Sequence, residues 1–472
     1  MISKIWLKER TEDSIPFMSA EKKCHLKQLG YVEEEYFISG TANVYDSGDD
    51  HVAYKIYSDA PYTNRIMIRR PADFKDFSGN VVVEILNASA TIDLDRMWVN
   101  AWRFFTRNGD IYIGLTSKSD VVPALYKFDP ERYKEINWSN PMPERQQPEN
   151  LEEFRFGFYP QFEYGLFWDM LGDLGKLLKN QVPDNPLKGY GDYKVYLTGW
   201  SQSTWYVMRW LKSFAYLPEN YDTGPLFDGY LSAGGSFHPA SINTYHPVKA
   251  NVFGNMGVNE MGAKEPLIAV NTESENAHVN WSGDSDTPGY LFRTYEFAGS
   301  THDTKNNIVD WYKDDEDLKR LGWEMRFEGV DGEPNDYPYE VLFQAAFNNL
   351  YQWVRNGVPA PHGEKIPRNS RRENMTDAFG NALGGVRTAA INYPTCRYYI
   401  TSKKADGSIN PLFGHIRVFS PQMLKELYGN AENYEQLVRE DCRVQVTKGF
   451  MLKEDVEWFV NELVQTAKAR GL

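Results

Sequence analysis

Residues 195–210 read VYLTGWSQSTWYVMRW and contain an abrupt change of pattern. A β-branched and apolar run ends at Gly199, and an aromatic-rich segment without Gly or Pro follows Ser203. The first pattern predicts a buried strand and the second predicts a helix. Ser201 therefore lies at a tight corner between a strand and a helix.

This corner resembles the G-x-S-x-G pattern of a nucleophile elbow, whose backbone strain presents the serine hydroxyl at the edge of a sheet. Ser203 replaces the second glycine and is still small enough to let the helix approach the strand. The alternative is an ordinary helix start with Ser201 as N-cap. We expect Trp200, beside the serine, to contact substrate or to support the pocket.

Apolar strands and helices alternate on both sides of this corner. Strands are expected within the segments 81–86, 110–117, 194–198, 226–235, 266–275 and 290–297, and helices over 95–107, 166–180 and 339–357. Such alternation predicts an α/β fold, with a mostly parallel central sheet and helices on both faces.

The character of the chain changes outside this core. Residues 1–80 are β-rich and lead into the sheet, 81–360 form the core, and 361–472 form a C-terminal elaboration packed on it. A cap-like insertion at about 117–165 is rich in proline, charge and aromatic residues. The candidate walls of a cleft in this insertion are Trp138, Phe154, Phe156, Phe158, Tyr159, Phe162 and Tyr164.

A serine nucleophile needs a general base, and histidine has a suitable pKa. In the fold that carries the elbow, the chain order is serine, acid, histidine. Of the eight histidines, His302 in the segment YEFAGSTHDT fits best, because it follows an apolar strand in a turn of small residues. The others precede the serine, leave no room for an acid, or fall beyond the long helix at 339–357.

The acid is expected after the preceding strand, in the segment PLIAVNTESE. Counting from Pro266 favours Glu275, with Glu273 as the alternative and Asp286 and Asp303 as weaker candidates. Either glutamate could hold the imidazole tautomer and stabilise the imidazolium.

A tetrahedral intermediate needs N–H donors. We expect one from the backbone of Gln202, which follows the nucleophile, and one from Asn87 or Ala88 in the loop after the strand at 81–86. The Asn87 side chain could instead fix that loop in place.

The net charge of the chain limits the classes of molecule that it is expected to bind. The net charge of −14 and pI of about 5.2 argue against nucleic acid and anionic membrane surfaces. No apolar run approaches the length of a membrane span, and the charged N-terminus is unlike a signal peptide, so a cytoplasmic location is expected.

No sequence motif indicates a metal or an organic cofactor, and we expect neither. Cys24, Cys396 and Cys442 are widely separated and are expected to be buried, reduced thiols, with a Cys396–Cys442 bridge as the alternative.

The segments RIMIRRP, SGNVVVEILN, LTGWSQS, FDGYL, FRTYEFAGSTH and FGNALGGVRT together resemble the α/β-hydrolase superfamily. More narrowly, they resemble a subfamily with a G-W-S-Q-S elbow, over residues from about 60 to 465. The resemblance implies the hydrolase fold and a serine-hydrolase mechanism, in which Ser201 and His302 match the nucleophile and the base.

The predicted function is hydrolysis of small-molecule carboxylic esters through an acyl-enzyme, with an aromatic or otherwise apolar substrate group. One alternative is an amidase or peptidase that uses the same three residues. The other is a binding protein that keeps the fold without the chemistry.

Overall fold

A large mixed sheet runs through the computed structural model, which describes residues 1–48, 51–145, 160–180, 184–235, 239–245, 263–275 and 283–472. In spatial order its strands are β1 (Ile2–Leu7), β2 (Tyr31–Ser47), β3 (Ala53–Pro71), β5 (Ile111–Leu115), β4 (Asn80–Ile85), β6 (Lys194–Trp200), β7 (Gly229–Ala233), β8 (Leu267–Thr272), β10 (Tyr290–Phe297) and β9 (Ser285–Thr287).

The six strands from β5 to β10 are all parallel to one another, whereas β1, β2 and β3 pair antiparallel on one side and β9 pairs antiparallel on the other. Because parallel strands end at the same edge, the loops after β4, β6, β8 and β10 gather there. The predicted α/β-hydrolase fold is confirmed.

Side chains alternate between the two faces of the sheet and pack under different helices. On β6, Val195 and Leu197 belong to the core under α4 (Phe167–Lys179) and α5 (Gln202–Ser213). Tyr196 and Trp200 belong to the core under α1 (Arg96–Asn108) and α8 (Glu340–Asn356). The sheet is therefore covered on both faces, which explains its continuous apolar strands.

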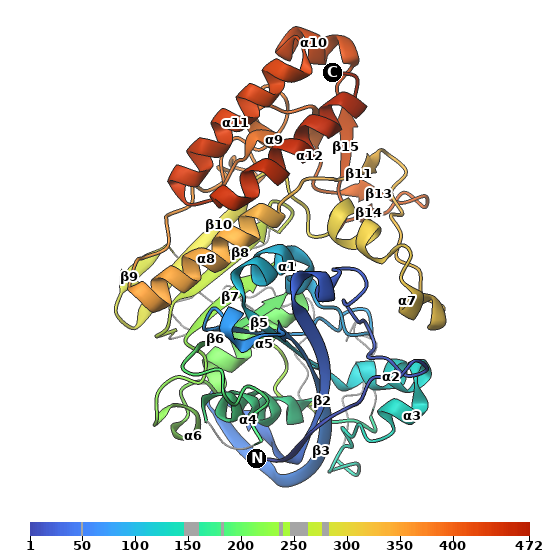
Figure 1. Cartoon of the computed structure of the whole chain (residues 1–472), viewed down its shortest axis with the longest axis vertical. Coiled ribbons are helices and arrows are strands. Elements are labelled where there is room, and N and C mark those ends of the chain that lie inside the picture. The colour runs from blue at the N-terminus through green and yellow to red at the C-terminus, as the bar shows by residue number, and fades with distance from the viewer. Residues whose placement is uncertain (49–50, 146–159, 181–183, 236–238, 246–262, 276–282) are drawn as a thin grey trace.

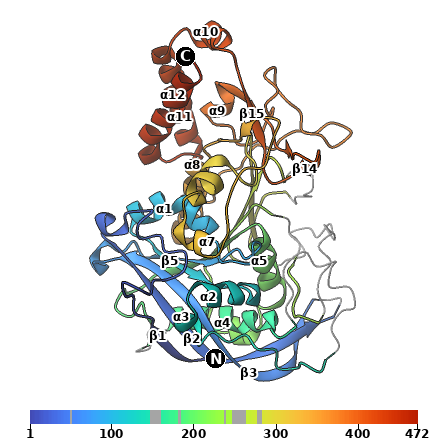
Figure 2. The ribbon, with the colours of Figure 1, turned by 90° about the vertical axis from the view of Figure 1, so that its right-hand side faces the viewer.

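The C-terminal part lies at one end of the molecule, and the long hairpin of β2 and β3 lies at the other (Figures 1 and 2). The apolar side chains of the C-terminal part join the core under α1 and α8. The elements of this C-terminal part, residues 361–472, are α9 (Ala389–Asn392), β12 (Cys396–Tyr398), β13 (Ser402–Lys403), β14 (Ile409–Asn410), β15 (His415–Val418), α10 (Pro421–Tyr428), α11 (Ala431–Lys448), η9 (Lys453–Asp455) and α12 (Val456–Ala469). β15 also pairs with β11 (Glu333–Pro334), which precedes α8 in the chain.

The described residues also form short helices: η1 (Leu26–Leu29), η2 (Phe74–Asp76), η3 (Ser119–Val121), α2 (Val122–Phe128), α3 (Pro130–Tyr133), η5 (Tyr164–Leu166), α6 (Pro218–Tyr221), η8 (Lys305–Asp310) and α7 (Glu316–Arg320). Cys24, Cys396 and Cys442 are buried and unbridged, as predicted.

The described part of the 117–165 insertion packs against the N-terminal strands. The guanidinium of Arg132 on α3 pairs with Glu35 of β2 at 2.6 Å, and Asn137 bridges to Thr63 of β3. Trp138 is fully buried in the core, so it does not line an open cleft. The predicted wall residues Phe154, Phe156, Phe158 and Tyr159 lie outside the described residues.

Candidate active site

Ser201 connects the end of β6 to the start of α5 in a strained backbone conformation. Its φ is 58° and its ψ is −120°, which a residue with a side chain adopts only at an energetic cost. The Ser201 N–H donates to the carbonyl of Ala233 at 2.8 Å, and its carbonyl accepts from Thr204 N–H at 2.9 Å. These bonds hold the serine at the corner, as a nucleophile elbow requires.

Small residues allow the helix to come close to the strand at this corner. A Cβ added to Gly199 would lie 2.8 Å from the Cβ of Ser203, so only glycine fits there. Ser203, which replaces the usual glycine, donates its hydroxyl to the carbonyl of Leu86 at 3.2 Å. The substitution therefore links α5 to the loop after β4.

His302 and Glu275 meet at the same edge of the sheet, after β10 and β8. The Nδ1 of His302 lies 2.7 Å from Oε1 of Glu275, and both side chains are largely buried. The other carboxylate oxygen accepts from the N–H of Thr272 at 2.8 Å. With Nδ1 held by the carboxylate, Nε2 is the ring nitrogen left to exchange a proton with a nucleophile.

The loop that carries His302 is fixed by two further contacts. The His302 N–H donates to Oγ of Ser274 at 3.0 Å, and the Tyr339 hydroxyl donates to the His302 carbonyl at 3.3 Å. The His302 ring lies 5.2 Å, between ring centroids, from the indole of Trp200, which directly precedes Ser201. The elbow and the histidine are therefore neighbours.

Glu273 points away from the histidine ring. Its Oε2 accepts from the N–H of Gly299 at 2.7 Å, and its Oε1 accepts from the side-chain amide of Asn374 at 3.3 Å. Burial raises the pKa of this carboxyl group. Glu273 thus ties the turn before His302 to the C-terminal part.

The two weaker acid candidates pair with arginines. Asp286 lies 2.7 Å from a guanidinium nitrogen of Arg293, and Asp303 lies 2.7 Å from one of Arg96. Of the four predicted acids, the structure brings Glu275 to the His302 ring.

Asn87 is committed to structural hydrogen bonds. Its N–H donates to the Leu94 carbonyl at 2.9 Å, and its side-chain amide donates to the Trp200 carbonyl, also at 2.9 Å. The prediction that the Asn87 N–H binds the intermediate is therefore wrong, because that N–H already donates to Leu94, and one of the two side-chain amide hydrogens is used on Trp200. Asn87 fixes the loop after β4 against the elbow, which was the alternative.

Two backbone N–H groups suit the donor role better. The Ala88 N–H has no acceptor among the described residues. Gln202 is the first residue of α5, and the first N–H groups of a helix lack partners within it. The dipole of α5 adds to the attraction for a negative oxygen.

Trp200 lies within the core beneath the elbow. Its side chain is fully buried and lies on the face of β6 that packs under α1 and α8, with its ring 5.5 Å from that of Phe343. Of the two predicted roles of Trp200, contact with substrate is contradicted by this burial, and support beside Ser201 and His302 remains. Strand alternation from Tyr196 was the sequence signal for this orientation.

A buried charge beyond β5 was missed by the sequence analysis. The Nζ of Lys118 lies 5.5 Å from the ring centroid of Tyr206 on α5. Burial lowers the pKa of Lys118 to about 8, although Asp120 opposes the shift. Burial also raises the pKa of Asp120 to about 6. The segment TSKSD carries no sequence pattern that distinguishes these charges from exposed ones.

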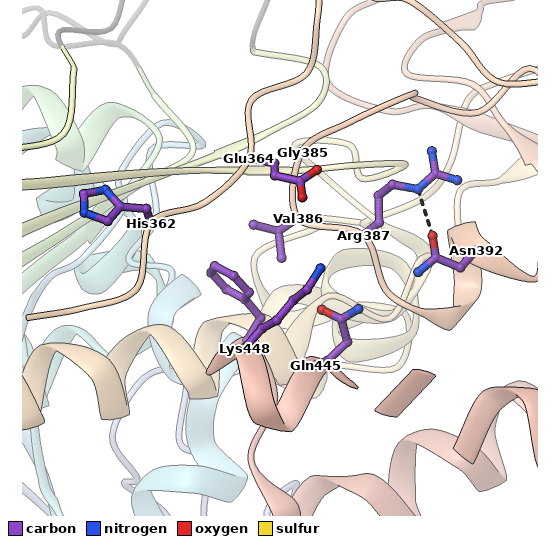
Figure 3. A pocket seen from close by; sticks show the side chains of 9 residues that line it. His362, Glu364, Gly385, Val386, Arg387, Asn392, Gln445 and Lys448 are labelled. Carbon is purple, nitrogen blue, oxygen red and sulfur yellow. Dashed lines mark hydrogen bonds between the residues drawn. The ribbon is translucent and has the colours of Figure 1, made fainter. Parts of the chain in front are cut away.

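A cavity of about 410 Å³ lies in the C-terminal part, between the segment 362–392 and the end of α11 (Figure 3). Arg387 faces it, but the guanidinium already donates to Asn392 at 2.9 Å and pairs with Asp377 at 2.9 Å. None of the predicted catalytic residues lines this cavity.

No group of three or more His, Cys, Asp or Glu side chains suited to a metal occurs in the part of the chain that the structure describes. Within those same ranges, no helix has both the length and the apolar character that crossing a membrane requires.

The model of the alpha/beta hydrolase domain family matches residues 8–461, so the chain belongs to this family. The fold and the family together define the protein as an alpha/beta hydrolase. No curated protein sequence matches.

The chain also shows low similarity to solved structures. The chain is similar to one of two fungal esterases from Rhizomucor miehei, with 8% identity, a TM-score of 0.27, and coverage of 58% of this chain and 83% of that one. An alpha-beta serine hydrolase homologue from Coxiella burnetii is 10% identical, with a TM-score of 0.24, and the match covers 52% of this chain and 88% of that one. Est1E from Butyrivibrio proteoclasticus is 9% identical, with a TM-score of 0.26, and the match covers 54% of this chain and 88% of that one.

Proposed function

We propose that this protein is a serine hydrolase that cleaves carboxylic esters through an acyl-enzyme on Ser201. The observation that carries the proposal is the buried pair of His302 Nδ1 and Glu275 Oε1, 2.7 Å apart, beside a serine with a φ of 58°. A strained serine, a histidine and a carboxylate after three parallel strands are the parts that acyl transfer needs.

In the first half of the reaction, His302 Nε2 accepts the Ser201 hydroxyl proton while Oγ bonds to the ester carbonyl carbon. The N–H groups of Gln202 and Ala88 stabilise the negative oxygen that forms. The intermediate then expels the alcohol, which takes its proton from His302, and the acyl group remains on Ser201.

In the second half, water replaces the alcohol. His302 accepts a proton from water as the water oxygen attacks the acyl carbon, and it returns that proton to Ser201 Oγ when the carboxylic acid leaves. Glu275 keeps the proton of the neutral ring on Nδ1 and stabilises the imidazolium in both halves.

The test compares wild-type protein with Ser201→Ala and Ser203→Ala on a panel of p-nitrophenyl esters and matched p-nitroanilides. We expect ester turnover in the wild type, a loss of at least about 10⁴-fold in kcat for Ser201→Ala, and a loss within about tenfold for Ser203→Ala. Near wild-type turnover in Ser201→Ala would refute the assignment of the nucleophile. If the anilides were cleaved faster than the esters, the proposed substrates would be amides and not esters.

A further inference from the structure

Arg96 and Asp303 form a buried ion pair next to the proposed base. Arg96 is the first residue of α1, and Asp303 directly follows His302. An Nη2 nitrogen of Arg96 lies 2.7 Å from Oδ1 of Asp303, and the two side chains are 5% and 10% exposed. The pair therefore joins the helix after the Asn87 loop to the loop that carries the histidine.

The same arginine contacts the residue before the nucleophile. The guanidinium carbon of Arg96 lies 5.2 Å from the ring centroid of Trp200, and the Trp200 ring lies 5.2 Å from the His302 ring. Contacts therefore link four residues in a ring: Arg96, Trp200, His302 and Asp303. Because Trp200 is covalently linked to Ser201, this ring of contacts connects the serine and the histidine between which the proton moves.

Stability alone is a weak explanation for this pair. Removing two charges from water costs several kcal/mol per ion, and a buried pair recovers this only with good hydrogen bonding. Among the described residues, Nε and Nη2 of Arg96 and Oδ1 of Asp303 are buried without hydrogen-bond geometry to any partner, so charge attraction holds the pair together. The backbone of Asp303 is already held, because its N–H donates to the Leu412 carbonyl at 2.9 Å.

We propose that Arg96 and Asp303 are positioning residues for His302, which hold its loop against Trp200 and cancel each other's charge beside the imidazole. The roles of Ser201 and His302 come from the proposed function, on which this inference rests. The pair has two effects. The ion pair fixes the His302 ring relative to the elbow. Because the charges of Arg96 and Asp303 cancel, the pair favours neither the imidazole nor the imidazolium form of His302.

Other groups near the ring are accounted for. Glu275 contacts Nδ1 directly, and Tyr339 donates to the His302 carbonyl. Tyr312 and Tyr339 face Arg96, and Glu340 lies next to Tyr339 at the start of α8. Arg96 and Asp303 both act on the pKa of Tyr339, but burial raises that pKa far above its usual value, so Tyr339 stays neutral when either is replaced. Opposite replacements in the pair should therefore have opposite electrostatic effects on His302.

The experiment titrates the His302 ring by NMR in histidine-labelled wild type, Arg96→Met and Asp303→Asn, with the signal assigned by His302→Ala. Arg96→Met leaves an unbalanced anion, which favours imidazolium, so the titration midpoint rises by about half a unit or more. Asp303→Asn leaves an unbalanced cation, so the midpoint falls by a similar amount. The double variant returns it toward the wild-type value.

A matched control is Arg293→Met, because Arg293 is also buried, pairs with Asp286 at 2.7 Å and lies 4.8 Å from the Trp353 ring. It should leave the His302 midpoint unchanged. Midpoints that stay fixed, or move in the same direction, in Arg96→Met and Asp303→Asn would overturn the proposal. If one single variant fails to fold, a midpoint in the other that stays fixed or moves against its predicted direction overturns the proposal.

Ester kinetics add the positioning readout. We expect Arg96→Met to lower kcat by about 10- to 100-fold with little change in KM, and the acid limb of its pH profile to move with the NMR midpoint. An unchanged kcat would refute positioning. A wild type that hydrolyses no ester would refute the proposed function, while the NMR titration would still decide whether the pair acts on His302.

Discussion

Two histidine–carboxylate pairs in this protein have nearly the same contact distance and very different surroundings. His302 and Glu275 are 2.7 Å apart, with side chains 8% and 14% exposed. His362 and Asp284 are 2.8 Å apart, but the His362 side chain is 62% exposed. Distance alone would make the two pairs equivalent.

Their neighbours separate them. His302 follows a parallel strand beside the strained serine, and its backbone N–H donates to Ser274 Oγ. His362 follows α8 and borders the cavity of the C-terminal part, and Asp284 is shared with Lys365 at 3.7 Å. An exposed pair gains little from its charges because water screens them. Burial and location on the sheet edge, rather than pairing, therefore mark the candidate site.

Replacing each histidine by alanine tests this comparison most strongly. We expect His302→Ala to lower ester kcat by about 10⁴-fold or more, because no base remains for Ser201. We expect His362→Ala to keep wild-type kcat. Steady-state hydrolysis of a p-nitrophenyl ester measures both, and equal losses in the two variants would contradict the distinction.

The two glutamates after β8 give a finer version of the same comparison. Glu275→Gln should lower kcat by about 10²- to 10⁴-fold, because an amide cannot stabilise the imidazolium. Glu273→Gln should lower kcat less than tenfold, because its carboxylate accepts from Gly299 and Asn374 instead. A larger loss in Glu273→Gln would exchange their roles.

Much of this site could be predicted because its signals are local. The strand, the small residues and the helix around Ser201 stand together in sequence, and so do the strand and turn before His302. The choice between Glu275 and Glu273 depends on how the turn folds: Thr272 N–H binds the Glu275 carboxylate. The structural role of Asn87 depends on its hydrogen bond to Leu94 across the loop. The Arg96–Asp303 pair joins residues that are 207 positions apart in the sequence. No local pattern records such contacts.

Glycine at the elbow affects packing more than chemistry. In Gly199→Ala the new methyl group would lie 2.8 Å from Ser203 Cβ and 2.9 Å from the Ser203 carbonyl oxygen. We expect a loss of about 1–3 kcal/mol in unfolding free energy, together with reduced activity. Denaturant unfolding measures it against Gly283→Ala, where the added Cβ meets no atom within 4 Å. Similar unfolding midpoints in the two variants would show that the helix can move away from β6.

The smallest expected effect tests how strongly burial acts near this sheet edge. The pKa of Lys118 is lowered from 10.5 to about 8 by burial, so the folded state binds fewer protons than the unfolded state between these values. The free energy of unfolding therefore rises with pH across that window. Below pH 8 Lys118 is charged in both states, so burying the charge lowers the free energy of unfolding by its full amount. Lys118→Met removes that cost.

Thermal unfolding of Lys118→Met and wild type should be compared at pH 7 and above pH 10.5. The Tm of the variant relative to wild type should be higher at the lower pH, by a few degrees. A Tm difference that is independent of pH would mean that burial does not disfavour this charge.

The most direct test of the central claim is covalent labelling with a fluorophosphonate, followed by peptide mass spectrometry. A serine activated by His302 attacks phosphorus and displaces fluoride, so the account predicts one adduct, on the peptide that contains Ser201. Labelling should be lost in Ser201→Ala and strongly slowed in His302→Ala, but kept in His362→Ala. Folded wild-type protein that takes up no label, or labels equally well without His302, would contradict it.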